Sequence, residues 1–125
     1  PIVKVAALIV AAGRGHRAGG PLPKQYLPLR GRAILRHTVN AFLNSGLVDV
    51  VQVAIHPDDR PLYDAAVADL TLAPPCSGGA SRQDSVRLGL EALAPMAPDL
   101  VLIHDGARPF VSSRLIGAVV GELAR

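Results

Sequence analysis

The chain has 125 residues, of which 50% are hydrophobic and only 3% aromatic, and its formal net charge is +3. This length suits one domain, and so small a charge with so few aromatic side chains gives no support for a nucleic-acid partner. The longest apolar run, residues 5–12, is far shorter than the roughly 20 residues of a membrane helix, and the single Cys76 cannot form an internal disulfide, so we expect a cytoplasmic protein with no membrane partner.

The first predicted elements are a buried strand, a basic loop and a helix. Residues 2–10 are almost entirely Val, Ile, Leu and Ala, which is typical of a strand covered on both faces. Residues 13–23 combine four glycines with two arginines and a histidine, so this loop is basic. Apolar side chains then recur at helical spacing, and Gly46 follows as a C-terminal glycine, which predicts a helix over residues 33–45.

The middle of the chain is predicted to hold a second buried strand and a second helix. Residues 48–55 form another apolar run, and Pro57 with two following aspartates opens a helix that we expect to continue to residue 69. Residues 70–73 are predicted as a short strand. Two prolines and two glycines then break the chain.

The last third is predicted to add two helices and a strand. A serine with an aspartate three residues later resembles a capping box for a helix over residues 81–93. Residues 99–104 form an apolar strand that closes on Asp105. A serine cap then predicts a final helix over residues 112–123.

Strands that alternate with helices indicate a doubly wound, mostly parallel α/β sheet, because parallel strands need crossover connections. We therefore predict a single domain over residues 1–125. Ligands of such sheets bind beyond the carboxyl ends of the strands, so the loops near Gly13, Gly79 and Asp105 should meet at one edge. Since the sequence begins at Pro1 and stops inside a predicted helix, we also expect it to be a fragment.

The glycine-bearing loop after the first strand is the first candidate ligand site. Glycines let backbone N–H groups approach phosphate oxygens, and Arg14, Arg17 and Lys24 supply the charge that a triphosphate needs. The motif Gly13-x-Gly15-x-x-Ala18 also matches a loose dinucleotide fingerprint. Two observations argue against a dinucleotide site. The fingerprint should open a helix, but the glycines and prolines that follow prevent one, and residues 30–37 contain no acidic residue that could bind the ribose of a dinucleotide. A merely solvated basic loop is the alternative.

Two further loops carry candidate binding residues. Asp105 directly follows an apolar strand, where a carboxylate is well placed to hold Mg²⁺. Its neighbour Gly106 leaves room for a ligand, and the guanidinium of Arg108 can pair with a phosphate. The pair Gly78-Gly79 precedes a helix start, where backbone can contact a base or an anion, and Ser85 lies one turn in. The alternative for the glycine loop is helix capping alone. The alternative for Asp105 is a helix cap or a surface ion pair with Arg108.

Four sequence blocks occur in the order Ala11-Ala12-Gly13-x-Gly15-x-Arg17, Pro23-Lys24-Gln25-Tyr26, Gly78-Gly79-x-x-Arg82-x-x-Ser85-Val86 and His104-Asp105-Gly106-Ala107-Arg108-Pro109. Together they resemble the 2-C-methyl-D-erythritol 4-phosphate cytidylyltransferase family, over nearly the whole chain but only about the first half of a family member. The resemblance implies a Rossmann-like nucleotidyltransferase fold. It also implies transfer of a cytidylyl group from CTP to 2-C-methyl-D-erythritol 4-phosphate, with release of pyrophosphate.

The resemblance further implies roles for individual residues. Arg17 and Lys24 would stabilise the pentavalent α-phosphate. Asp105 would organise Mg²⁺ or another divalent cation, and Asp105 and Arg108 would bind the acceptor, a small polyol phosphate. The residues implied in nucleotide binding are Ala11, Ala12, Gly13, Arg14, Gly15, Lys24, Gly79, Ala80, Ser85 and Gly106.

The chain departs from the family at Ala18 and Ala80, where members often have Met and an acid. The second half of a family member supplies more acceptor contacts and a dimerisation arm. We therefore expect a homodimer for the full-length enzyme, and an isolated chain that binds CTP weakly without turnover. Fusion to the cyclodiphosphate synthase is compatible with the sequence. The alternatives are another acceptor such as ribitol phosphate, an NAD-dependent oxidoreductase, or a non-catalytic nucleotide-binding remnant.

Overall fold

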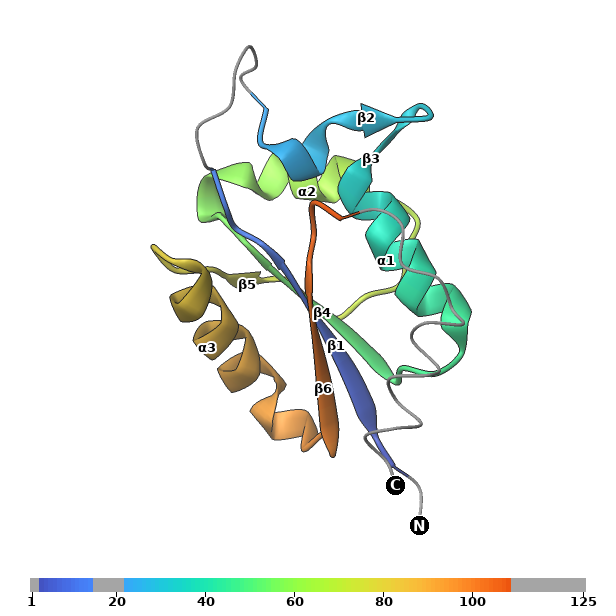
Figure 1. Ribbon diagram of the computed structural model, residues 1–125, viewed down its shortest axis with the longest axis vertical. Helices are drawn as coiled ribbons and strands as arrows, with labels where there is room; N and C mark the ends of the chain where they lie inside the picture. The colour runs from blue at the N-terminus through green and yellow to red at the C-terminus, as the bar shows by residue number, and fades with distance from the viewer. Residues whose placement is uncertain (1–2, 15–21, 109–125) are drawn as a thin grey trace.

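The computed structural model describes residues 3–14 and 22–108. Their main feature is a four-stranded sheet in the order β5-β4-β1-β6, in which every pair of neighbours is parallel (Figure 1). This confirms the predicted parallel α/β sheet. The strands are β1 (Val5–Ala11), β4 (Val50–Ile55), β5 (Cys76–Ser77) and β6 (Leu100–Asp105).

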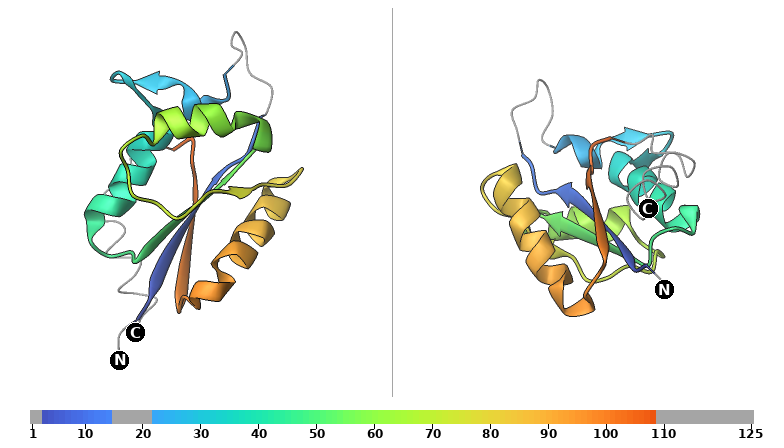
Figure 2. Two further views of the ribbon diagram at one scale, coloured as in Figure 1. Left: turned by 180° about the vertical axis from the view of Figure 1, so that it is seen from behind. Right: turned by 60° about the horizontal axis from the view of Figure 1, so that its bottom comes forward.

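Helices cover both faces of the sheet, as Figures 1 and 2 show. One side of β1, including Ile9, packs in a core with α1 (Ile34–Ser45) and α2 (Arg60–Ala66). The other side, including Leu8, packs in a second core with α3 (Arg82–Leu93). No helix in the described part of the chain combines the length and the apolar character that crossing a membrane requires.

The order of the strands places a topological switch point between β1 and β6. The chain moves from β1 to β4 and then to β5, and it crosses back through α3 to add β6 on the opposite side of β1. The register pairs Ile9 with His104 and Val10 with Asp105. The turn after β1 and the acid that ends β6 therefore lie at the same end of the sheet, where such folds bind ligands.

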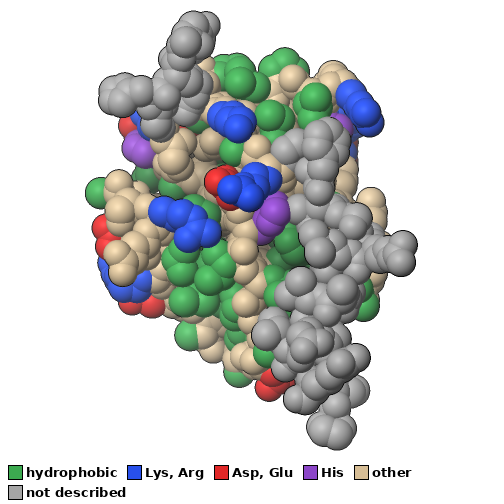
Figure 3. Space-filling view, in the orientation of Figure 1, with side chains coloured by type: hydrophobic (Ala, Val, Ile, Leu, Met, Phe, Trp, Pro, Cys, Tyr) green, Lys and Arg blue, Asp and Glu red, His purple; other side chains and the backbone are tan. Residues whose placement is uncertain are grey.

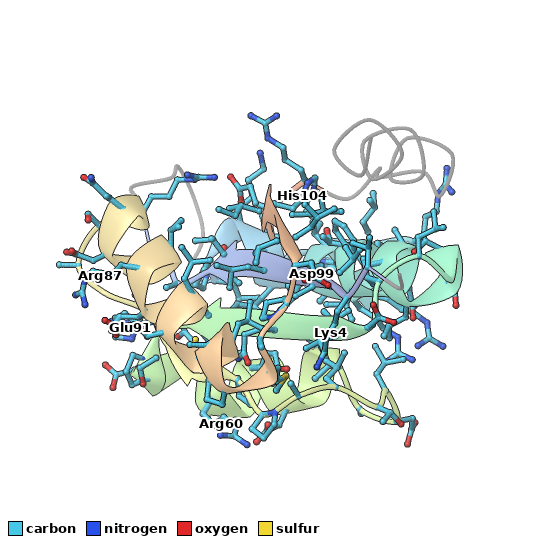
Figure 4. The ribbon with its side chains drawn as sticks, turned by 90° about the horizontal axis from the view of Figure 1, so that it is seen from below. Lys4, Arg60, Arg87, Glu91, Asp99 and His104 are labelled. Atoms are coloured by element: carbon cyan, nitrogen blue, oxygen red, sulfur yellow. The ribbon has the colours of Figure 1, made fainter. Side chains whose placement is uncertain are left out.

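The opposite end of the sheet is fastened by two carboxylates that precede β4 and β6. Asp49 Oδ2 accepts a hydrogen bond from Val5 N at 2.8 Å, and Asp99 Oδ2 accepts one from Lys4 N at 2.7 Å. Figure 4 shows Lys4 and Asp99 side by side, and Lys4 Nζ also donates to Met96 O at 2.7 Å. These contacts fix the start of β1 against both neighbouring strands.

Two predicted helices agree with the structure and one is shorter than predicted. The helices over 33–45 and 81–93 correspond to α1 and α3, and Ser81 Oγ accepts from Asp84 N at 3.0 Å as an N-cap should. The helix predicted to reach residue 69 begins as a 3-10 turn, η2 (Pro57–Asp59), and α2 ends at Ala66. Its C-cap Val67 leaves the helical conformation (φ −110°, ψ 17°), and the chain then turns through Asp69, which is left-handed with φ 71°.

The short strand predicted over residues 70–73 is wrong. Leu70 and Leu72 are partly buried against the core, so their alternation reflects packing of an extended loop. Pairing with β4 begins only at Cys76, after two prolines, because proline has no N–H to donate to a ladder.

One region that the sequence left as loop is structured. Lys24–Tyr26 forms a 3-10 turn, η1, and two short strands, β2 (Pro28–Leu29) and β3 (Arg32–Ala33), pair as an antiparallel hairpin. Its two-residue turn has positive φ at Arg30 (54°) and Gly31 (81°), as hairpin turns of this length require. The helix predicted over 112–123 lies outside the described residues.

We predict that Gly89→Ala destabilises the protein by about 1–3 kcal/mol, because it overpacks the core between α3 and β1. A Cβ at this buried position would overlap Leu8 Cδ1 and lie 2.7 Å from Leu8 Cδ2, and Leu8 is fully buried. Without that contact, alanine in a helix interior would stabilise by about 1 kcal/mol. Denaturant unfolding measures whether the free energy of unfolding falls or rises in the variant.

Leu90→Ala is the matched control, because the neighbouring Leu90 is 40% exposed and its truncation should cost only about 0.5 kcal/mol or less. An unchanged or increased free energy of unfolding in Gly89→Ala would contradict the tight packing of α3 on β1.

Candidate functional site

A pocket of about 540 Å³ opens at the carboxyl end of the sheet. It lies where the loops that follow β1, β4 and β5 converge with the end of β6. Its walls are formed by Val10, Ala12, Gly13, Arg14, Gln25, His56, Pro57, Gly78, Gly79, Ala80, Ser81, Arg82, Ser85 and Asp105.

The backbone that follows β1 is held from behind by a buried glutamine. Gln25 is 4% exposed, and its Nε2 donates to Ala11 O at 2.7 Å and to Gly13 O at 3.1 Å. Gly13 itself is exposed, and a Cβ built there would meet no atom within 4 Å. The loop is therefore fixed through its carbonyls while open space remains above Gly13.

Arg14 is tied to a buried carboxylate at the start of α2. Its Nη2 lies 2.5 Å from Asp59 Oδ1 and its Nε lies 3.3 Å from Asp59 Oδ2, and Asp59 is 3% exposed. The hydrogen bond to Asp59 raises the pKa of Arg14. Of the three cations that the sequence assigned to phosphate binding, Arg14 is thus engaged in fastening the loop to α2.

Two neutral tyrosines lie in the layer behind this ion pair. Burial, followed by the charge of Asp59, raises the pKa of Tyr26 well above its usual range. Burial also raises the pKa of Tyr63 to about 12. Both rings therefore stay uncharged at neutral pH and belong to the core under α1 and α2, and the charge of Asp59 acts on Tyr26.

The loop between β5 and α3 approaches the β1 loop so closely that it needs glycine. A Cβ at Gly78 would overlap Ala12 Cβ and lie 2.8 Å from Ser85 Oγ. Ser85 is 2% exposed, and its Oγ accepts a hydrogen bond from Gly79 N at 3.0 Å. This hydroxyl orders the glycine loop beside the first turn of α3, whose positive dipole end adjoins the pocket.

Asp105 ends β6 with its carboxylate exposed beside the pocket. Its Oδ1 accepts from Ala107 N at 2.9 Å, which forms a tight turn, and Gly106 N donates to Val10 O at 2.8 Å. A Cβ at Gly106 would lie 3.0 Å from Ala11 Cβ, so glycine keeps the ends of β1 and β6 together.

A shallower hollow adjoins the pocket at Asp105. It is lined by Arg82, Ile103, His104, Asp105 and Arg108. Figure 3 shows basic side chains gathered on this face around an acidic one, with a histidine beside them. The hollow suits an anionic group that lies next to a ligand in the main pocket.

The structure brings most of the predicted site residues together. Ala11 and Gly106 are buried directly behind the pocket, Arg108 is in the adjoining hollow, and Lys24 is exposed on η1. Gly15 and Arg17 lie outside the described residues. Those that line the pocket are Ala12, Gly13, Arg14, Gly79, Ala80, Ser85 and Asp105.

The donors available for a metal are few. Over residues 3–14 and 22–108 no group of three or more His, Cys, Asp or Glu side chains is placed to hold an ion. Asp105 offers one exposed carboxylate, so a cation there would take most of its ligands from a bound molecule and from water.

Sequence reasoning missed several residues of the pocket wall. His56 and Pro57 follow β4 at its carboxyl end, and the same rule that placed the other loops could have found them. Arg82 appears in both hollows, although its motif was considered only for its glycines and Ser85. Gln25 has no local signal, because its hydrogen bonds reach back to the β1 loop.

Comparison with known proteins identifies related sequences and folds. The sequence model of the family IspD: 2-C-methyl-D-erythritol 4-phosphate cytidylyltransferase matches residues 5–125. The bifunctional enzyme IspD/IspF of Paramagnetospirillum magneticum is 56% identical over 124 residues, which cover 99% of this chain and 32% of that protein. The chain thus spans about a third of the length of the curated relatives that it matches.

Two solved structures share the fold. The 4-diphosphocytidyl-2C-methyl-D-erythritol synthase of Anaerococcus prevotii superposes with a TM-score of 0.78 at 25% identity, over 98% of this chain and 52% of that one. A Mycobacterium tuberculosis protein in complex with manganese gives a TM-score of 0.70 at 23% identity, over 97% of this chain and 60% of that one. The second likeness concerns the fold alone.

We predict that Gly78→Ala lowers the free energy of unfolding by about 1–3 kcal/mol, because Ala12 Cβ has no side-chain torsion that could move it away from the added methyl group, and Ser85 Oγ could move only by breaking its hydrogen bond with Gly79 N. Gly13→Ala is the matched control, since open space surrounds that position, and its cost should stay within about 0.5 kcal/mol. Equal destabilisation of the two variants would contradict the close approach of the two loops.

Proposed function

Because the chain belongs to the 2-C-methyl-D-erythritol 4-phosphate cytidylyltransferase family, we propose that the protein carrying it transfers a cytidylyl group from CTP to 2-C-methyl-D-erythritol 4-phosphate. The observation that carries this proposal is the pocket at the switch point, where the β1 loop, the glycine loop before α3 and Asp105 face one space. A nucleotide with its phosphates along the β1 loop fits the position of this space in the fold.

The proposed reaction needs no protein nucleophile. An oxygen of the acceptor phosphate attacks the α-phosphorus of CTP and forms a new P–O bond. The bond from the α-phosphorus to the oxygen bridging to the β-phosphate breaks, and pyrophosphate leaves with that electron pair. Catalysis then consists of holding the two substrates in line and neutralising the charge that accumulates on the α-phosphate oxygens.

The two glycine-bearing loops supply the nucleotide site in this proposal. Ala12 and Gly13 would contact the phosphates through their backbone, and Gly79 and Ser85 would contact the base and ribose. The hydrogen bond from Gly79 N to Ser85 Oγ supports this role, because it fixes the glycine loop before any ligand binds.

The cations proposed to stabilise the transition state are Arg17 and Lys24. Lys24 is exposed at the start of η1. Its ammonium makes no hydrogen bond or ion pair with the described residues, so its charge is available to a phosphate. In contrast, the guanidinium of Arg14 is already engaged by Asp59.

Asp105 and Arg108 would serve the metal and the acceptor. A single exposed carboxylate suits Mg²⁺ or another divalent cation that binds mainly to phosphate oxygens and water. When bound, the ion would neutralise phosphate charge. Arg108, in the hollow next to Asp105, would pair with the phosphate of the polyol.

The proposal extends to the complete enzyme. The curated relatives are bifunctional IspD/IspF enzymes, so this chain would form part of the cytidylyltransferase half of such a protein. We further propose that the complete enzyme is a homodimer, as the family resemblance implies. We also propose a cytoplasmic location, since one cysteine in 125 residues suits a reducing compartment.

The first test is nucleotide selectivity. CTP with Mg²⁺ should protect the complete protein against thermal unfolding by about 2.7 kcal/mol at 100 times its Kd, and ATP, GTP and NAD should protect it less. Equal protection by all nucleotides would remove the cytidine specificity, and tight NAD binding without pyrophosphate release would favour an oxidoreductase. A pyrophosphate-release assay in which 2-C-methyl-D-erythritol 4-phosphate and ribitol phosphate are supplied separately identifies the acceptor.

The second test concerns the two cations. Lys24→Ala and Arg17→Ala should each lower kcat by about 10²–10³-fold while thermal unfolding stays unchanged, because each removes a charge contact that is strongest in the transition state. Arg87→Ala is the control: Arg87 pairs with Glu91 at 3.2 Å on the outward side of α3 (Figure 4) and should leave turnover intact. Near-normal turnover in the first two variants would reject their catalytic roles.

A further inference from the structure

We propose that Gln25 is a positioning residue, which fixes the catalytic Lys24 relative to the loop that holds the nucleotide phosphates. The inference rests on the proposed function, because it concerns the alignment of Lys24 with a substrate in the pocket. It goes further by assigning a task to a residue that touches no reacting atom.

The hydrogen bonds of Gln25 join two parts of the site that are separate in the sequence. Its amide nitrogen donates to Ala11 O and Gly13 O, at 2.7 and 3.1 Å, so the two protons of one NH₂ group bridge both ends of the turn after β1. The side chain is 4% exposed, and it also forms part of the pocket wall. Hydrogen bonds in such a sheltered place hold their partners more tightly than exposed ones.

The short turn η1 transmits this anchorage to Lys24. Tyr26 N donates to Pro23 O at 2.9 Å, and Leu27 N donates to Lys24 O at 3.1 Å, so the turn is closed around Lys24. Tyr26, which follows Gln25, is 6% exposed and packs into the core that contains α1 and α2. The backbone of Lys24 is therefore held by its two successors, while its own side chain is exposed.

The chemistry at this position requires an amide rather than merely a long side chain. Both partners are carbonyl oxygens, which only accept hydrogen bonds, and the amide NH₂ offers two donors. A glutamate of the same shape would place a carboxylate oxygen against these carbonyls, and a methionine would leave both carbonyls without this donor. Either change would release η1 from the β1 loop, and a displacement of about 1 Å at a catalytic group can cost about 10²-fold in rate.

The chain contains a matched control for this glutamine. Gln52 on β4 is 2% exposed, and its Nε2 also donates to two carbonyls, Pro74 O at 2.7 Å and Val53 O at 3.3 Å. It is not among the residues that line the pocket. Replacing Gln52 therefore removes the same kind of buried hydrogen bond without touching the link to Lys24.

The experiment compares Gln25→Met and Gln25→Glu with Gln52→Met in the complete enzyme. We expect both Gln25 variants to lower kcat by about 10- to 100-fold, with a smaller change in the KM for CTP, and Gln52→Met to keep kcat within about twofold of the wild type despite a similar loss of thermal stability. The Glu variant preserves the shape of the side chain and keeps the test available if the Met variant folds poorly.

A double-mutant cycle shows whether Gln25 acts through Lys24. In a Lys24→Ala background, adding Gln25→Met should lower kcat by less than about threefold, because the group being positioned is already absent. An undiminished effect in that background, normal kcat in the Gln25 variants, or equal losses in Gln52→Met would each overturn the inference. Absence of cytidylyl transfer in the wild-type enzyme would instead refute the proposed function.

Discussion

The structure depends on the complete burial of β1. All seven residues of Val5–Ala11 are buried, with one row of side chains in the core under α1 and α2 and the other in the core under α3. Both faces and both edges of this strand are covered, because β4 and β6 pair with it on either side. The loop after Ala11 therefore lies beside the carboxyl end of β6, and the candidate site is built around that loop.

The sequence was sufficient to predict this part of the molecule for physical reasons. The apolar runs that became β1 and β4 are too uniform for a strand with one wet face, and glycines or an acid follow β1 and β6 directly. The run that became β6 is equally apolar, although β6 lies at the edge of the sheet and Ile103 is exposed. Periodicity and Ser81 were also enough to locate α1 and α3. From these elements, the meeting of the loops at Gly13, Gly79 and Asp105 follows from general rules of parallel sheets.

The remainder could not be predicted because it is decided by contacts between distant residues. The alternation at residues 70–73 resembled a strand, but it reflects packing of Leu70 and Leu72 against the core, and the sheet pairs only from Cys76. The partner of Arg14 is a carboxylate 45 residues away, so its sequence neighbourhood suggested only a free cation. Gln25 was one residue of a sequence block, with no role assigned to it, and only its burial and hydrogen bonds show what it holds.

The two carboxylates at the amino end of the sheet have a consequence for how the site can change. Asp49 and Asp99 set the alignment of β1 with β4 and β6 at the end of the sheet farthest from the pocket. Strand pairing therefore depends less on the loops at the other end, where the close contacts to be kept are those of Gly106 with Ala11 and of Gly78 with Ala12. Outside these contacts the loops are free to diverge.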